Sequence, residues 1–167
     1  VTDPRVGFLS FIGSARVGWM LRSKLAAGAR CALEHGGAAP VIMAEDADYE
    51  AALPKLLKGG FYHAGQVCVS VQRVFVHRSM AREFARKLAE GAEKLIIGDP
   101  TLAETEVGPL IRPAEVKRIE QWVDEAVKEG AELMAGGKML TQTTYSCTVL
   151  YNPSPASKVS NQEIFGP

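Results

Sequence analysis

The sequence predicts an α/β fold with a mostly parallel, open sheet and helices on both of its faces. Short apolar runs alternate with helical stretches through most of the chain, a pattern typical of βαβ units. The 167 residues are 47% hydrophobic and 23% charged, which provides enough apolar material for a core of ordinary size. Gly, Ser and Pro residues separate the apolar runs from the helical stretches, as expected at element boundaries.

The first third of the chain is expected to form a strand, a helix and two further short strands. Residues 6–12 are an apolar run, and Ser14 is placed to cap the helix that follows it. Gly28 is expected to end this helix. Residues 31–33 and 41–43 are expected to form the second and third strands.

The next helix is expected to open at Asp46 or Asp48. Pro54 falls beyond its first turn, where proline removes a backbone donor and should kink the helix or delay its start. Residues 59–60 are both Gly and weaken it again. The chain is therefore expected to reach Cys68 as broken helix or loop.

Two longer helices are predicted in the second half of the chain. The first runs from Ala81 to about Leu95, with its apolar residues on one stripe. The second begins at Pro113, a favourable first helical position, and ends at Gly130. Short strands are expected at residues 71–76, 132–135 and 148–151.

Charge and composition argue against several classes of protein. The 19 basic and 19 acidic residues cancel, so no basic field attracts nucleic acid. No segment approaches the ~18 consecutive apolar residues of a membrane helix. The three cysteines (Cys31, Cys68 and Cys147) are widely spaced and suit neither a disulfide framework nor a zinc site. A reducing, cytoplasmic setting is expected, and the missing initiator Met indicates a fragment or a processed product.

Cys68 is the strongest candidate for a catalytic group. It follows Gly65 and Gln66, a turn that favours an exposed thiol and close approach of a substrate. An accessible thiolate is an effective nucleophile. The alternative is a buried cysteine that packs as a small hydrophobic residue, and this is the interpretation that we favour for Cys31 and Cys147.

Glu34 is the second candidate, because it ends the strand predicted at residues 31–33. Open α/β sheets bind ligands at this end of their strands; the alternative is a surface glutamate on a turn. Residues 13–18 follow a strand and open a helix whose N–H groups can receive a phosphate. They do not match the G-x-G-x-x-G fingerprint, so a simple capping turn is the alternative. His63 and His77 are expected to be ordinary polar histidines.

Read in order, these segments resemble the NAD(P)-dependent aldehyde dehydrogenase superfamily. The resemblance begins with residues 11–18 and 33–40, and continues with residues 65–68 and Arg73. Downstream, four further motifs extend it over nearly the whole chain: residues 98–100, residues 108–110, residues 130–132 with 136–137, and residues 163–167. His35 stands where the family usually has an apolar residue, so the surroundings of Glu34 are expected to differ.

The resemblance implies a role for each of these residues. Cys68 matches the catalytic nucleophile, and Glu34 matches the general base. The cofactor, NAD or NADP, is expected to contact five residues: Gly13, Ser14 and Gly18 near its pyrophosphate, and Glu163 and Phe165 near its nicotinamide ribose. No metal is implied.

The resemblance also implies a truncated version of the aldehyde dehydrogenase catalytic-domain fold. Residues 1–35 correspond to the tail of the cofactor-binding domain, and residues 36–167 to a catalytic domain that is incomplete at its C-terminus. In its full-length context the protein is expected to be a cytoplasmic homo-oligomer. It would oxidise a small-molecule aldehyde to an acid through a cysteine thiohemiacetal and a thioester. Two alternatives stay open: a non-catalytic globular fragment, and an enzyme that passes the thioester to coenzyme A.

Overall fold

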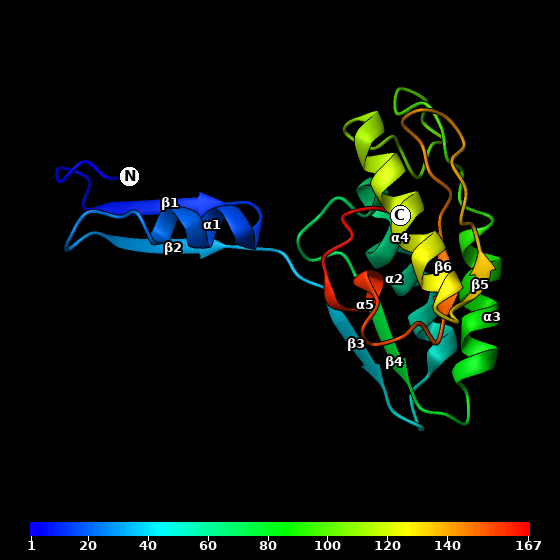
Figure 1. Cartoon of the computed structure of the whole chain (residues 1–167). Coiled ribbons are helices and arrows are strands. Elements are labelled where there is room, and N and C mark those ends of the chain that lie inside the picture. Colours follow the sequence, from blue (N-terminus) through cyan, green and yellow to red (C-terminus); the bar gives the residue numbers. More distant parts are fainter. The chain divides into compact units, whose positions relative to one another are not determined.

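The computed structural model describes all 167 residues and divides the chain into two compact units, Val1–Gly37 and Ala38–Pro167. Each unit combines strands with helices, and the first four strands form two parallel pairs (Figure 1). The predicted α/β class with mostly parallel strands is therefore confirmed. The strands form three separate two-stranded sheets, however, rather than one continuous sheet.

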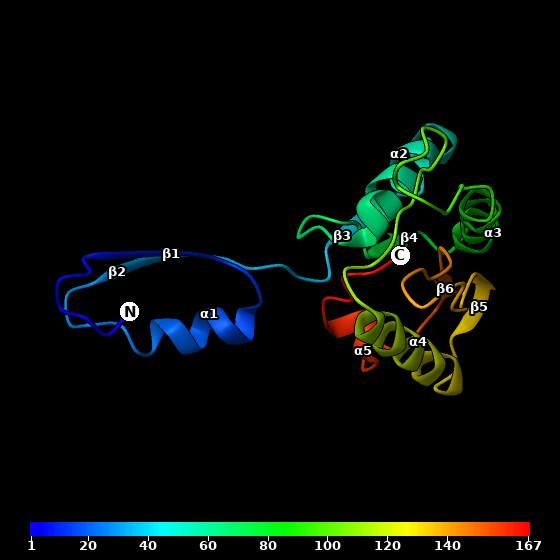
Figure 2. The same cartoon turned by 90° about the horizontal axis from the view of Figure 1, so that it is seen from above.

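The first unit is a strand–helix–strand arrangement. Strands β1 (Phe8–Ile12) and β2 (Arg30–Glu34) pair in parallel, and helix α1 (Ala15–Arg22) connects them. The helix lies on one side of the pair (Figure 2). Burial alternates along β1, which leaves alternate side chains on the open face, and Ile12 there is 78% exposed.

Helix α1 ends earlier than predicted, at Arg22 instead of near Gly28. Gly28 has a φ of +81° and lies in a turn that is closed by the hydrogen bond from Ala29 N to Ala26 O, at 3.1 Å. Glycine adopts this left-handed conformation without strain. The residue thus serves the turn that leads into β2, and the prediction that it caps the helix is wrong.

In the second unit, strands β3 (Pro40–Met43) and β4 (Arg73–Val76) also pair in parallel. Helix α2 (Tyr49–Phe61) crosses between them, and helix α3 (Ala81–Ala92) packs beside α2. A small core under this pair is centred on the buried side chains of Met43, Leu56 and Phe84.

Helix α2 begins at Tyr49, where the Asp48 carboxylate caps it by accepting a hydrogen bond from Ala51 N at 3.1 Å. Pro54 lies inside the helix without delaying its start, so the expectation of a late start is wrong. Leu56 and Phe61 are buried beyond the proline, and this packing outweighs the lost backbone hydrogen bond. The helix breaks only after Phe61, in the short 3₁₀ segment η1 (Tyr62–Gly65).

The rest of the second unit covers the other side of the strands. Helix α4 (Pro113–Lys128) leads into β5 (Glu132–Ala135), which pairs antiparallel with β6 (Val149–Tyr151), and α5 (Lys158–Asn161) follows. Seen from above, α2 and α3 lie on one side of β4 and β6, and α4 and α5 on the other (Figure 2). The face of the β3–β4 pair that carries Ile42 and Phe75 stays exposed, however.

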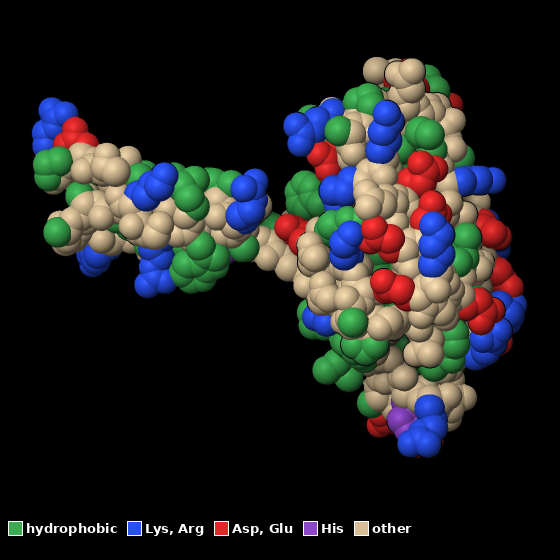
Figure 3. Space-filling model, in the orientation of Figure 1, with side chains coloured by type: hydrophobic (Ala, Val, Ile, Leu, Met, Phe, Trp, Pro, Cys, Tyr) green, Lys and Arg blue, Asp and Glu red, His purple; other side chains and the backbone are tan.

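The main core of this unit is formed by residues from the end of α2 and η1, from α3, α4, β5 and β6, and from the loops between them. Its most deeply buried large side chains are Tyr145, Ile119, Val107 and Val116. Acidic and basic side chains are interspersed over the face of the unit that carries α4 (Figure 3). None of the helices has both the length and the apolar character needed to cross a bilayer.

Candidate functional site

Cys68 lies exposed in a tight turn of the second unit. Ser70 N donates to Val67 O at 2.9 Å and closes this turn. The other two thiols are more protected: Cys31 is half-buried in β2 and Cys147 is buried. Burial, with a smaller contribution from Glu106, raises the pKa of the Cys147 thiol to about 12. Cys68 is therefore the thiol that a solute reaches most readily.

The Gln66 side chain stabilises the residues just before this turn through three hydrogen bonds. Its Nε2 donates to His63 O at 3.1 Å and to Pro109 O at 3.2 Å, and its Oε1 accepts from Ile111 N at 2.9 Å. Two of these contacts reach a loop more than 40 residues away in the sequence. The carboxamide thus fixes the residues just before Cys68 to the body of the unit.

Two glycines bring the C-terminal segment against the same turn. A Cβ added to Gly65 would lie 2.0 Å from Gly166 O, and one added to Gly166 would lie 2.2 Å from Ile119 Cδ1. Gly65 also has a φ of +69°, which favours glycine. A side chain at Gly65 would push the two backbones apart, and one at Gly166 would collide with the Ile119 side chain. Gly166 therefore packs against Gly65, three residues before Cys68.

Glu163 carries the most unusual carboxylate of this segment. Its Oε1 atom is buried and has no hydrogen-bond partner. Burial raises the pKa of this carboxyl group, and the nearby Arg118 partly opposes that effect. Phe165 follows with a φ of +48° and a side chain that is 41% exposed. A buried carboxylate oxygen without a partner is unusual in proteins and marks Glu163 as a candidate binding group.

The first unit carries the remaining candidates, and they lie at one end of its parallel strand pair. Glu34 is exposed at the end of β2, and its carbonyl oxygen accepts from Gly13 N at 3.1 Å. Ser14 is the N-cap of α1, but its hydroxyl makes no hydrogen bond to the helix. The N–H groups of the first helical turn fit an anion such as a pyrophosphate.

Gly18 lies in α1, where a Cβ would come within 2.0 Å of the Nε2 atom of His35. The His35 ring also meets the edges of the Phe11 and Trp19 rings, at centroid distances of 6.5 and 5.6 Å. His35, the residue that follows Glu34, therefore packs directly against α1 at Gly18. Glycine is required at position 18 because a larger side chain would clash with His35, and not because the backbone is left-handed there.

Comparison with known proteins identifies the family. The model of the aldehyde dehydrogenase family matches residues 1–167. The chain belongs to the aldehyde dehydrogenase family. It is 45% identical over 163 residues to 3-sulfolactaldehyde dehydrogenase from Priestia megaterium, an alignment that covers 97% of this chain and 34% of that protein.

Solved structures of aldehyde dehydrogenases share the fold. The betaine aldehyde dehydrogenase of Staphylococcus aureus, in complex with NAD+, is 34% identical with a TM-score of 0.89, over 97% of this chain and 34% of that one. The glyceraldehyde-3-phosphate dehydrogenase of Methanocaldococcus jannaschii, complexed with NADP, is 36% identical with a TM-score of 0.94. The match covers 100% of this chain and 36% of that chain. This aldehyde dehydrogenase chain thus spans about a third of the length of the relatives that it matches.

One residue of this aldehyde dehydrogenase chain was not predicted from the sequence. The Gln72 Nε2 atom donates to Val159 O at 2.8 Å and to Gln162 O at 2.7 Å, and its Oε1 atom accepts from Ile164 N at 3.0 Å. The partners lie about 90 residues further along the chain. No local pattern marks such a contact, because only the fold brings the two segments together.

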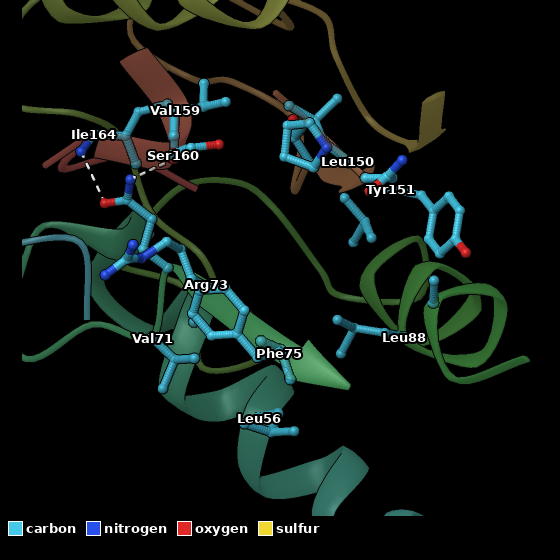
Figure 4. Close-up of a pocket in the computed structure, with 18 of the residues that line it drawn as sticks. Leu56, Val71, Arg73, Phe75, Leu88, Leu150, Tyr151, Val159, Ser160 and Ile164 are labelled. Carbon is cyan, nitrogen blue, oxygen red and sulfur yellow. Dashed lines mark hydrogen bonds between the residues drawn. The ribbon is translucent and has the colours of Figure 1, made fainter. Parts of the chain in front are cut away.

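A pocket of about 590 Å³ lies next to Gln72, between β4 and β6 (Figure 4). Consecutive residues of each strand line it, over residues 71–76 and 148–153. Neighbouring residues of a strand point to opposite faces, so the pocket runs along the unpaired edges of the strands rather than over one face. It is separate from the Cys68 turn, whose residues do not line it.

Proposed function

We propose that this chain carries the thiol centre of an enzyme that oxidises a small-molecule aldehyde to a carboxylic acid with NAD or NADP. The observation that carries the proposal is the exposed Cys68 thiol, three residues after Gly65, whose backbone packs on Gly166. Membership of the aldehyde dehydrogenase family supports it. The NAD+ and NADP complexes of the two structural relatives support a nicotinamide cofactor without choosing between the two forms.

Residues 1–35 are the tail of the cofactor-binding domain, and residues 36–167 belong to the catalytic domain. The bound cofactor would accept a hydride from the aldehyde carbon. Five residues would hold it: Gly13, Ser14 and Gly18 at the pyrophosphate, and Glu163 and Phe165 at the nicotinamide ribose.

The Cys68 thiolate attacks the carbonyl carbon and forms a carbon–sulfur bond, which gives a thiohemiacetal. The backbone N–H of Cys68 is a candidate donor to the oxygen that becomes negative in this step. Loss of the hydride then leaves a thioester on the sulfur. Glu34 removes a proton from water as the water oxygen attacks the thioester carbon. The carbon–sulfur bond breaks, and the acid and the thiolate are released.

The thiol assignment is tested with Cys68→Ala in the full-length protein, with Cys31→Ala as the control. We expect NADH or NADPH formation to fall by about 10³-fold or more in Cys68→Ala, because the covalent step is lost. Cys31→Ala should keep the parental rate. Iodoacetamide at mildly alkaline pH should label Cys68 before Cys31 and Cys147. Unchanged turnover in Cys68→Ala would refute the proposal and favour a non-catalytic chain.

The role of Glu34 is tested with Glu34→Gln, which keeps the side-chain length but cannot accept a proton. We expect a burst of reduced cofactor close to one per active site, followed by slow release of acid. Rapid-mixing absorbance at 340 nm separates the two phases. A parental rate of acid release would exclude Glu34 as the base. Turnover that requires added coenzyme A would favour the alternative in which a thiol, instead of water, receives the acyl group.

A further inference from the structure

The three partners of the Gln72 side chain define the orientation of its carboxamide. Two of them are carbonyl oxygens, on Val159 and Gln162, and the third is the N–H group of Ile164. Only the amide nitrogen can donate to the carbonyls, and only the amide oxygen can accept from the N–H group. Both amide hydrogens are therefore used. A glutamate of the same length would keep the acceptor and lose both donors.

These contacts lie where the main chain lacks regular partners. Helix α5 has only four residues, which is too short to be stable in isolation. The Val159 carbonyl is among the last carbonyls of this helix, which have no partner within it. The Gln162 carbonyl and the Ile164 N–H group lie in the extended segment that follows. Gln72 therefore ends the helix and holds the first residues of that segment with one side chain.

Glu163 lies between the two residues that Gln72 holds on either side. Its backbone is tied to Gln72 through Gln162 O and Ile164 N. Gln72 itself comes four residues after Cys68 and directly before β4. One side chain thus connects the strand that follows the thiol turn with the segment that presents the buried Glu163 carboxylate.

We propose that Gln72 is a positioning residue that sets the place of the Glu163 carboxylate for cofactor binding. This inference rests on the function proposed for Glu163. Two other anchors hold the same segment further along: Arg118 Nη2 donates to Ile164 O at 2.6 Å, and Gly166 packs on Gly65. Loss of the carboxamide therefore loosens residues 162–164 locally and leaves the rest of the unit folded.

The test uses the full-length protein and two substitutions, Gln72→Leu and Gln72→Glu. Gln72→Leu removes all three hydrogen bonds, whereas Gln72→Glu removes the two donors and keeps the acceptor. Gln142→Leu and Gln142→Glu are the matched controls, because Gln142 is exposed in the loop between β5 and β6. Hydrogen–deuterium exchange reports on the segment, titration with NAD and NADP gives the dissociation constants, and iodoacetamide labelling of Cys68 reports on the turn.

We expect faster exchange in the peptide that covers residues 162–167 of Gln72→Leu, with no change at β3. In Gln72→Leu the dissociation constant of the preferred cofactor should rise roughly tenfold, since three backbone groups lose their hydrogen-bond partner. The KM for the aldehyde and the rate of Cys68 labelling should stay near their parental values. Gln72→Glu should also weaken cofactor binding, and the Gln142 variants should match the parent. Unchanged exchange and affinity in Gln72→Leu, or a uniform rise in exchange over the whole unit, would overturn the proposal.

Glu163→Gln separates this inference from the function on which it rests. If Glu163→Gln binds the cofactor as the parent does, the carboxylate is not a cofactor ligand and the proposed function of Glu163 fails. The exchange result for Gln72→Leu is independent of that outcome. Exchange reports whether Gln72 orders residues 162–167, whereas cofactor affinity reports whether the Glu163 carboxylate binds the cofactor. If both hold, Glu163→Gln and Gln72→Leu should weaken cofactor binding without changing the labelling of Cys68.

Discussion

Close contacts at single glycines connect sequence motifs to the geometry of the candidate site. Gly18 leaves room for the Nε2 atom of His35, and Gly65 leaves room for the backbone of Gly166. In both places the hydrogen atom of glycine is what allows the approach. His35 thus has a structural explanation: its ring fills the space above α1, next to Glu34.

We expect Gly18→Ala to destabilise the first unit by about 1–3 kcal/mol, the usual cost of overpacking. Its Cβ would lie 2.0 Å from His35 Nε2. The double substitution Gly18→Ala with His35→Ala should recover part of this loss, because the clash is removed. Urea unfolding followed by the fluorescence of Trp19 measures the effect in a Trp122→Phe background.

Gly7→Ala is the matched control for this cycle, because a Cβ at Gly7 meets nothing within 4 Å. It should change the free energy of unfolding by less than about 0.5 kcal/mol. If Gly18→Ala proves as harmless as Gly7→Ala, the His35 ring does not occupy the place that the structure gives it.

At the scale of elements, the sequence predicted the existence of helices and strands better than their ends. Pro113 begins α4, and the apolar residue Phe84 is buried in α3, because local sequence decides both features. Helix α2 continues through Pro54 because the burial of Leu56 and Phe61 outweighs the local effect of the proline. Long-range packing is not visible in a local pattern.

The same limit applies to the candidate site. The exposure of Cys68 followed from its Gly-Gln turn, and the position of Glu34 followed from the strand that it ends. The bridge from Gln72 to residues 159–164 could not be predicted, since it depends on the approach of two segments about 90 residues apart. The antiparallel β5–β6 pair was missed too, because Gly136 and Gly137, both with positive φ, help to reverse the chain there.

The cap of α2 provides a prediction at this scale. Asp48→Ala should lower the free energy of unfolding of the second unit by about 1 kcal/mol, because the first turn loses the acceptor of the Ala51 N–H group. Asp46→Ala, two residues earlier and exposed, should have almost no effect. Chemical denaturation followed by circular dichroism compares the two, and equal losses would show that the carboxylate does not act as the cap.

At the scale of the whole molecule, each of the three sheets has only two strands, so every strand has one unpaired edge. β4 and β6 each have one neighbouring strand only. Ile42 and Phe75 lie opposite each other in the β3–β4 pair and are 81% and 53% exposed. Exposed edges beside apolar side chains favour association with another chain.

We therefore expect the 167-residue chain to self-associate as its concentration rises. Ile42→Lys and Phe75→Lys should each reduce this association, because a charge beside a strand edge opposes pairing. Leu102→Lys is the control, since Leu102 is 51% exposed in a loop away from the strands. Sedimentation velocity over a range of concentrations measures the effect. A purely monomeric parent chain would contradict the prediction.

The packing of Gly65 on Gly166 also bears on how the protein is made. Cys68 leaves the ribosome roughly a hundred residues before Gly166, which corresponds to about 5–20 s of translation. During that interval the turn lacks the backbone that later packs against it. The rate of elongation between these two glycines therefore sets how long the residues before Cys68 remain without this backbone contact.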